Sequence, residues 1–373
     1  MASDEVPPLS LGDRFVKVDC DDVVGSAESM ADLAARTPVD AIVATDDAGV
    51  ELAAAAAQRI GLPHSPPDAV AATVDKILLR RHLDATEINQ PGYAVVGPGD
   101  DARATMETMG GPVVVKPATL SASRGVIRVD DPRDVESVVD RVRTIQRDHG
   151  VDRDRPLLIE RFVPGTEIAV EASVWDGRFQ VLAVFDKPEP LDGPYFEETI
   201  YVTPSREPHV EEAVELVRRT TEALGLTHGP IHAEVRIHDG RPVLIEIAAR
   251  SIGGLCGRAL RFGLMGSSLE TLILAQALGI DASPHRQPGA AGVLMVPIPN
   301  RGLLEGFEGV EETLAIEGIT GFEPATHIGD QVAPPPEDGR YLGFVFARAK
   351  APEDVVDALV AAKGTLTPKV RAR

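Results

Sequence analysis

The first part of the chain combines two short apolar runs with helical patterns. Residues 14–19 and 39–47 are apolar segments of strand length, and each precedes a helix-spaced pattern, the second being the alanine-rich stretch 49–61. This order predicts a short, Rossmann-like βαβα unit. A proline-rich break follows, and a charged helix is expected at about 71–83. Because an open parallel sheet usually begins with a strand and a glycine-rich turn, we interpret residues 1–72 as a truncated first domain.

From Gly92 the apolar pattern changes between strand and helix spacing. The expected strands are 93–97, 112–118, 126–131, 157–163, 168–177 and 178–188, and the expected helices are 102–109 and 132–149. The last three strands follow one another through short turns, which favours an antiparallel meander. These elements predict a second domain over residues 73–285.

The last part of the chain again mixes strands and helices. Strands are expected at 292–299, 320–328 and 341–349, with two helical patterns, one of them at 352–362. The segment 326–339 is typical of an exposed loop. The whole chain is therefore predicted to be an α/β and α+β multidomain protein, with a small α+β domain at 286–373.

The segment 231–250 sets two alternating runs on either side of Asp239-Gly240, a signal for a β-hairpin. A two-residue loop would put Glu234 and Glu246 on opposite faces. The apolar residues of both runs share one face only if the pair numbers sum to an even number, so we expect a three-residue loop, His238 to Gly240. Glu234 and Glu246 then lie on the same face.

His232, Arg236, Ala248 and Arg250 are expected on that face as well, because side chains alternate along a strand. One interpretation of this face is a solvated outer surface of the sheet. The other is a magnesium site, since Mg²⁺ is commonly held by one or two carboxylates together with substrate phosphates. The second interpretation requires a nucleotide site elsewhere in the chain.

Composition limits the partners. The 373 residues carry a formal net charge of −21, which argues against nucleic acid and against an anionic membrane surface. Cys20 and Cys256 form neither a disulfide framework nor a zinc spacing. Residues 1–13 lack the pattern of a signal peptide, and no apolar run has the length of a membrane span. We therefore expect a cytoplasmic protein.

The polar segment 120–125 is a candidate phosphate loop. Ser121, Ser123 and Gly125 allow a close approach of backbone N–H groups, and Lys116 and Arg124 supply positive charge. An ordinary polar hairpin tip is the alternative.

Other site motifs are missing or incomplete. The chain has no P-loop sequence, no G-x-G-x-x-G fingerprint and no G-x-S-x-G elbow. His232-Ala233-Glu234 resembles the H-x-E of zinc deaminases, but no P-C-x-x-C follows it. Zinc, dinucleotide and serine-nucleophile chemistry are therefore not favoured.

Taken in order, six segments resemble the ATP-grasp superfamily. They are VDKILLRRHL around Lys76, VVVKPA around Lys116, SASRGV, IERFVPGTE, HAEVRI and IEIAARSIGG. The resemblance covers roughly residues 40–285. Within the superfamily, residues 185–205 and the last ~90 residues are similar to the L-amino acid ligases, a group of carboxylate-amine ligases. The resemblance implies an ATP-grasp fold with a mobile lid at about 105–165.

The resemblance also implies roles for individual residues. Lys76 and Lys116 would hold the ATP phosphates, and Glu167 would bind the ribose hydroxyls. The adenine would be framed by Glu160, Arg161, Phe162 and Val163. Glu234 and Glu246 would carry one or two Mg²⁺ ions, with Mn²⁺ as an alternative. Ala248 stands where many of these enzymes have a metal-binding asparagine, which leaves the second ion open.

The remaining roles concern the substrates. Arg250 would meet the phosphoryl group in transfer, and the backbone of Gly253 and Gly254 would approach the acceptor or the acyl phosphate. Glu198, His232 and Ser251 are candidate contacts of the substrates.

The implied activity is ATP-dependent amide or dipeptide ligation through an acyl phosphate, with release of ADP and phosphate. The partners would be a small carboxylate and an amine, both expected to be amino acids. Two alternatives stay open: a bicarbonate-activating enzyme, and an ATP-binding module without turnover. Oligomeric state is open too, with a homodimer the commonest case.

Overall fold

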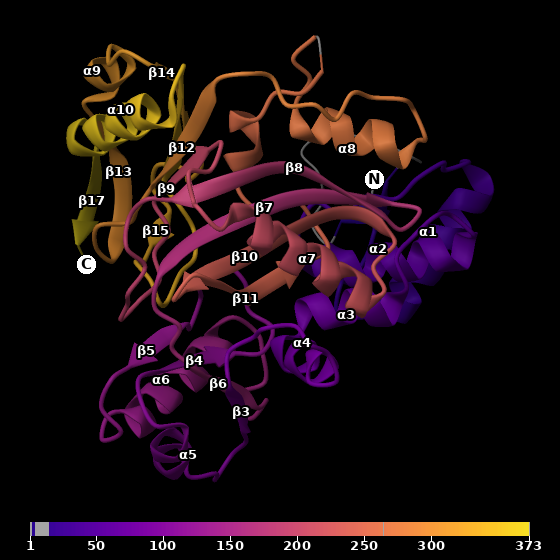
Figure 1. The fold of residues 1–373 in the computed structure, drawn as a ribbon. Helices are drawn as coiled ribbons and strands as arrows, with labels where there is room; N and C mark the ends of the chain where they lie inside the picture. Colours follow the sequence, from indigo (N-terminus) through magenta and orange to yellow (C-terminus); the bar gives the residue numbers. More distant parts are fainter. Residues whose placement is uncertain (1, 4–14, 264, 373) are drawn as a thin grey trace.

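The computed structural model describes residues 2–3, 15–263 and 265–372, and a large antiparallel sheet forms its centre (Figure 1). Within these residues the sheet has eight strands in the order β11-β10-β7-β8-β9-β12-β16-β14. The strands are β7 (Thr166–Trp175), β8 (Arg178–Lys187), β9 (Ile200–Thr203), β10 (His228–His238), β11 (Arg241–Ala248), β12 (Ala290–Val296), β14 (Ile319–Pro324) and β16 (Gly343–Ala349). The sheet therefore crosses the expected boundary at residue 285.

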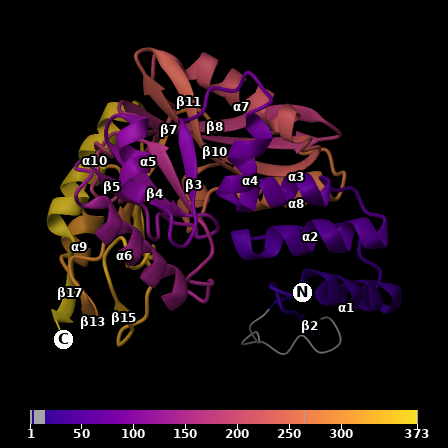
Figure 2. The same ribbon diagram turned by 90° about the horizontal axis from the view of Figure 1, so that it is seen from below.

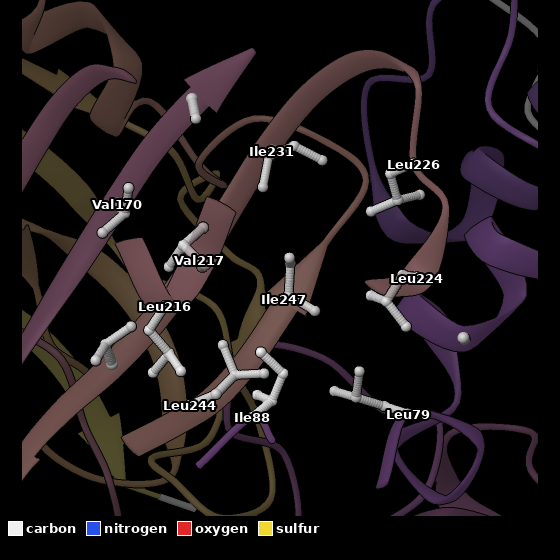
Figure 3. Packing of buried hydrophobic residues seen from close by; sticks show 14 of the residues in the cluster. Leu79, Ile88, Val170, Leu216, Val217, Leu224, Leu226, Ile231, Leu244 and Ile247 are labelled. Atoms are coloured by element: carbon white, nitrogen blue, oxygen red, sulfur yellow. The ribbon is translucent and has the colours of Figure 1, made fainter. Parts of the chain in front are cut away.

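The two faces of this sheet are covered by different helices. On one face α3 (Pro67–Val74), α4 (Lys76–Leu83) and α7 (Val210–Leu224) pack on a buried cluster that includes Val170, Ile231 and Ile247 (Figure 3). On the other face Phe185 and Tyr201 join a second cluster with the 3-10 helix Cys256–Ala259 and α8 (Leu269–Ala277). Alternation along each strand thus separates two apolar cores.

A smaller sheet forms the region expected to be a lid, and it lies beside β7 and β11 (Figures 1 and 2). Its strand order is β3-β6-β4-β5. The elements are β3 (Tyr93–Val96), α5 (Ala102–Met109), β4 (Val113–Pro117), β5 (Ile127–Val129), α6 (Val135–Asp148) and β6 (Leu157–Arg161). These lie within or close to the predicted ranges.

The predicted meander is wrong in one strand. β6 pairs with β3 and β4 in the smaller sheet, and of the three expected strands β7 and β8 pair with each other. The chain changes sheets through a turn at Gly165, which has a φ of 115°. A Cβ at this position would lie 1.9 Å from the carbonyl oxygen of Ile237, so a glycine is required.

The N-terminal prediction is also only partly correct. β2 (Val16–Lys17) pairs in parallel with β1 (Ala2–Ser3), and α1 (Val23–Arg36) and α2 (Asp47–Ile60) form as expected. Residues 39–46, however, form no strand in the described structure. A strand is stable only with a hydrogen-bonded neighbour, which the apolar pattern alone does not reveal.

The charged helix expected at about 71–83 is two helices, α3 and α4. They are separated at Asp75, which has an extended backbone and caps α4. Its carboxylate accepts hydrogen bonds from the N–H groups of Ile77 and Leu78 at 2.8 and 3.1 Å. Asp75 therefore competes with the helical backbone, as an N-cap residue does.

The C-terminal region adds a three-stranded sheet and two helices to the large sheet. The sheet order is β15-β13-β17. The elements are β13 (Gly302–Glu308), α9 (Val310–Leu314), β15 (Gln331–Val332), α10 (Pro352–Thr365) and β17 (Thr367–Ala372). The segment expected to be an exposed loop is partly engaged, because it contains β15 and the carbonyl of Pro336 accepts the N–H of Gly125 at 2.8 Å.

Within the described ranges, none of the helices is both long and apolar enough to span a bilayer.

Candidate active site

The hairpin β10–β11 does place Glu234 and Glu246 together, but by a different route from the predicted one. The loop has two residues, Asp239 and Gly240, with φ angles of 49° and 69°, and His238 pairs with Arg241. The register shifts by one residue between Glu234 and Val235, and beyond this β-bulge Glu234 is the direct partner of Glu246. The bulge in β11 therefore places Glu234 and Glu246 on the same face, as the sequence pattern required, without a three-residue loop.

The bulge also changes which residues of β11 face the apolar core. Alternation predicted that Ile245 lies on the same face as Ile247, and this prediction is wrong. Leu244 and Ile247 point into the core beneath α7, as Figure 3 shows. Ile245 and Glu246 both line a pocket on the opposite side of the sheet. The carbonyl of the extra residue, Ile245, accepts a hydrogen bond of 2.6 Å from Arg80. The bulge therefore brings Glu246 to the pocket without exposing the core.

A pocket between the smaller sheet and the large sheet contains most of the residues predicted to bind a nucleotide. We call it the nucleotide pocket. Of the predicted residues, its lining includes Lys76, Lys116, Ser121, Ser123, Glu160, Arg161, Phe162, Val163, Glu167, Glu198, Glu234 and Glu246. Pro91, Val114, Leu191, Phe196 and Ile245 add an apolar part. The combination of an apolar slot and cationic groups suits a nucleotide.

The cationic end is built around Glu160. Its buried carboxylate lies 2.5 Å from Lys116 Nζ and 2.6 Å from Arg80 Nε. Burial by itself would raise the pKa of Glu160, but the two cations outweigh it and lower the pKa. Burial lowers the pKa of Lys116. Lys76 donates to the carbonyl of Leu120 at 2.9 Å and lies 3.3 Å from Glu246.

Arg236 joins the walls of the apolar slot. This buried side chain donates to Glu167 at 2.7 Å, to the carbonyl of Val163 at 2.7 Å and to the carbonyl of Leu191 at 2.5 Å. Its guanidinium also lies over the rings of Phe162 and Phe196, 5.3 and 5.5 Å from their centroids. One side chain therefore fixes segments from β6–β7, β7 and the β8–β9 connection.

Three carboxylates surround a buried lysine at the centre of the site. Lys187 Nζ lies 2.5 Å from Glu167 and 3.0 Å from Glu234, and it also contacts Glu198. Burial would lower the pKa of Lys187, but the three carboxylates raise it well above its usual value. Burial raises the pKa of Glu198 to about 7. The lysine stays charged and holds the carboxylates together.

His232 and Arg250 are each fixed by an acidic partner. His232 Nδ1 contacts Glu171, and burial, which would lower its pKa, is outweighed by Glu171 and Glu234, so the pKa rises to about 9. Arg250 forms a two-pronged pair with Asp47 of α2, at 2.7 and 3.0 Å. The N-terminal region thus positions the predicted phosphoryl-contacting arginine.

A second cavity, of about 400 Å³, adjoins the nucleotide pocket. Five residues line both: Ser121, Ser123, Glu198, Glu234 and Glu246. The second cavity is also lined by His232, Arg250, Gly253 and Gly254 of the predicted set. Its other walls come from α2, β9, β12 and the C-terminal region.

Three predicted residues line neither space. Arg124 donates to the carbonyl and hydroxyl of Ser121 at 3.0 and 3.2 Å, and the N–H of Gly125 is bound to Pro336. The carbonyl of Ser251 accepts from Arg250 at 2.9 Å. In this conformation, these residues support neighbours of the cavities instead of lining them.

Several site residues were not singled out from the sequence. They are Asp47, Arg80, Glu171 and Lys187, and Arg236 was placed on the right face without a role. Lys187 ends an alternating strand as its last buried position, a weak signal that an ion pair lies there. The other three lie far in sequence from the groups they contact.

Three protein-family models match successive parts of the chain, in the same order as the regions described above. Residues 109–259 match the family described as ATP-grasp domain, residues 4–64 match the ATP-grasp N-terminal domain, and residues 294–371 match L-amino acid ligase C-terminal domain 2. The chain contains an ATP-grasp domain. The predicted fold class, an ATP-grasp fold with smaller domains before and after it, is confirmed.

Individual relatives of this ATP-grasp protein are ligases. Alanine–anticapsin ligase of Bacillus subtilis is 29% identical over 61% of this chain and 51% of its own length. L-arginine-specific L-amino acid ligase of Bacillus subtilis is 22% identical over 85% of this chain and 77% of its own length. The chain thus spans about half the length of the first of these relatives.

A solved structure gives the same fold. The L-amino acid ligase from Bacillus licheniformis superposes with a TM-score of 0.80 and 24% identity, covering 96% of this chain and 88% of that one. The arrangement of domains in this ATP-grasp protein is therefore that of an L-amino acid ligase.

Proposed function

We propose that the protein is an ATP-dependent carboxylate-amine ligase that joins amino acids through an acyl phosphate. The observation that carries this proposal is the shared wall between the nucleotide pocket and the second cavity. Glu198, Glu234 and Glu246 line both spaces, so a phosphate of a bound nucleotide and a carboxylate in the second cavity would meet there. Named relatives that join amino acids support the same assignment.

The reaction has two steps. A carboxylate oxygen of the first substrate attacks the γ-phosphorus of ATP, which gives an acyl phosphate and ADP. The amine of the second substrate then attacks the acyl carbon, the C–O bond to phosphate breaks, and phosphate leaves. Both steps depend on positioning and on offsetting negative charge, so no nucleophilic side chain is needed.

The residues present fit a magnesium ion. Glu234 and Glu246 are direct cross-strand partners that line both the nucleotide pocket and the second cavity, and hard cations prefer carboxylate oxygens. Glu234 and Glu246 would hold the ion. When bound, Mg²⁺ would screen the phosphate charges. Lys76, Lys116 and Arg250 would supply positive charge from the chain itself.

Other parts of the nucleotide pocket would hold the rest of ATP. The segment from Glu160 to Val163 would frame the adenine, and Glu167 would accept hydrogen bonds from the ribose. Ser121 and Ser123 line the pocket where the phosphates would lie. Residues 105–165 would act as the lid that keeps water from the acyl phosphate.

A substitution of Glu246 tests the shared wall. Glu246→Gln should reduce ATP turnover at least about a hundredfold, because the metal loses a charged ligand, while the thermal midpoint stays close to the wild type. Glu305→Gln is the control, since Glu305 is an exposed residue that pairs with Arg371 on the C-terminal sheet. Near-normal turnover in Glu246→Gln would contradict the proposal.

The same fold also serves solved structures described as biotin carboxylase and as N5-carboxyaminoimidazole ribonucleotide synthetase. A bicarbonate-activating enzyme is therefore the second candidate, and it would show ATP turnover stimulated by bicarbonate. A cytoplasmic location and a homodimer complete the proposal, with domain limits at residues 72 and 285, the second of which divides the sequence but not the eight-stranded sheet.

A further inference from the structure

The lining of the second cavity contains two chemically different sets of residues. The ionised set is shared with the nucleotide pocket and is joined by His232 and Arg250, and we call its part of the lining the ionised end. The apolar set belongs to the hydrophobic cluster beneath α8, and we call its part of the lining the apolar end. The cavity-lining members of that cluster are Tyr201, Ile252, Cys256, Met295, Tyr341 and Phe344.

The C-terminal region supplies much of the apolar end. Met295 of β12 and Phe344 of β16 are direct cross-strand partners, and both are buried. Tyr341 packs edge-on against Phe344, with 6.1 Å between the ring centroids. Residues of the C-terminal region therefore form much of the apolar lining of this cavity.

Phe344 is pressed against the glycine-rich turn that follows Arg250. A Cβ at Gly254 would lie 2.6 Å from Phe344 Cζ, and Gly254 has a φ of 59°. The glycine leaves room for the ring, and the ring takes the space that a side chain at residue 254 would fill. Phe344 therefore bounds the cavity next to the predicted catalytic turn.

The groups at the apolar end are uncharged. Burial raises the pKa of the Cys256 thiol and of the Tyr201 hydroxyl well above their usual values. Elsewhere in the lining, charged groups are already engaged. Arg340 binds Asp338 and the carbonyl of Gln331, and Asp46 caps α2 by accepting the N–H of Gly49 at 3.0 Å.

We propose that this end binds the side chain of the amino acid whose carboxylate is activated, and that Phe344, Met295 and Tyr341 select an uncharged, apolar side chain of limited size. The inference rests on the proposed ligase function. The activated carboxylate has to lie at the ionised end, where the γ-phosphate would be, so its side chain extends toward the apolar end. A charged side chain there would lose its hydration without gaining a partner.

Hydroxylamine makes the choice of carboxylate substrate measurable without knowledge of the natural amine. Its nitrogen attacks the acyl phosphate, phosphate leaves, and the hydroxamate is read by its iron(III) colour. With Mg-ATP and single amino acids, kcat/KM for leucine or methionine should exceed that for aspartate or lysine by on the order of a hundredfold.

Substitution of Phe344 should change the order of the amino acids ranked by kcat/KM. Phe344→Ala should raise kcat/KM for tryptophan relative to leucine at least about tenfold, because space opens beside Gly254. Phe344→Leu and Met295→Ala remove less volume from the same wall and test the same shift if Phe344→Ala does not fold. Val345→Ala is the matched control, because Val345 is buried on the opposite face of β16, in the cluster beneath α10.

The outcomes separate this inference from the proposed function. A changed ranking in the Phe344 or Met295 variants, with an unchanged ranking in Val345→Ala, supports it. Hydroxamate formed from leucine but with the same ranking in every variant overturns the inference alone, as does equal activity with charged amino acids. No hydroxamate from any amino acid, with ATP bound, overturns the proposed function together with the inference.

Discussion

At the scale of single residues, the nucleotide pocket depends on buried charges that share partners. Glu160 accepts from Lys116 and Arg80, and Glu167 accepts from Lys187 and Arg236. A buried ion pair adds little net stability when it is complete, but loss of one partner leaves an uncompensated charge. Such residues fix the positions of the cations that would face ATP.

Glu160→Gln should therefore destabilise the fold strongly. Removal of its charge leaves Lys116 and Arg80 without their carboxylate, which should lower the free energy of unfolding by about 3–5 kcal/mol. Urea denaturation measures the change. Glu28→Gln, which breaks the exposed pair with Arg59, should cost less than about 1 kcal/mol. Equal effects of the two substitutions would refute the role of burial.

The same variant has a predicted pH dependence. The pKa of Glu160 is lowered in the folded state, so its contribution is present above the ordinary value of 4.5 and is lost as the pH falls through the folded value. The stability difference between wild type and Glu160→Gln should be largest above pH 4.5 and should shrink in acid. A difference that grows on acidification would contradict this.

Arg236→Lys should weaken nucleotide binding. Lysine keeps the charge but cannot reproduce the three directed hydrogen bonds to Glu167, Val163 and Leu191, so ADP affinity should fall about ten- to a hundredfold. Calorimetric titration with ADP measures it. Arg219→Lys, on the exposed pair with Glu87, should bind ADP as the wild type does.

The resemblance to ATP-grasp enzymes singled out Lys76 and Lys116, and apolar alternation predicted that Glu234 and Glu246 share a face. Neither predicted Lys187 as the counter-ion of the buried carboxylates. Lys187 pairs with Glu167, Glu198 and Glu234 only because three strands and a connecting loop come together in the fold. The local sequence around Lys187 does not predict this tertiary contact.

At the scale of elements, the prediction for the hairpin β10–β11 was correct about the face shared by Glu234 and Glu246 but wrong about the length of the loop. Apolar alternation predicted that Glu234 and Glu246 share a face, and the sequence rule for an even register placed the extra residue in the turn. The structure places it at Ile245, where Arg80 binds the bulged carbonyl. A three-residue loop and a β-bulge both place Glu234 and Glu246 on the same face, so apolar alternation alone does not distinguish them.

The two-residue turn makes a prediction. Gly240→Val should lower the free energy of unfolding by about 1–3 kcal/mol, because φ at this position is 69° and a β-branched residue is strained there. Asp239→Asn should change it by less than about 0.5 kcal/mol, since asparagine accepts positive φ. Thermal or urea unfolding compares the two. A neutral Gly240→Val would point to a wider loop.

At the scale of the molecule, the smaller sheet is held against the C-terminal region. Arg141 of α6 pairs with Glu337 at 2.6 Å, His149 bonds the carbonyl of Glu337 at 2.8 Å, and Gly125 bonds Pro336. The apolar pattern predicted both regions, but it did not predict their contact, because the contacting residues are far apart in sequence and polar. Gly339 and Arg340, which follow Glu337 in the chain, line the second cavity together with Ser121 and Ser123.

If residues 105–165 act as a lid, these contacts should control access to the loop 120–125. Glu337→Ala removes the ion pair with Arg141 and should speed trypsin cleavage at Arg124, and a non-hydrolysable ATP analogue should slow cleavage of the wild type. Mass spectrometry of timed digests identifies the cut. Cleavage at Arg124 that responds to neither change would contradict the lid.

The central claim is that this ATP-grasp protein joins amino acids. The most direct measurement is ADP release with Mg-ATP across amino acids, singly and in pairs, with bicarbonate alone as a separate arm and product masses read in parallel. The account predicts ADP release that requires an amino acid and a product whose mass equals two substrates less one water. ADP release driven by bicarbonate, or none with any amino acid while ATP binds, would contradict it.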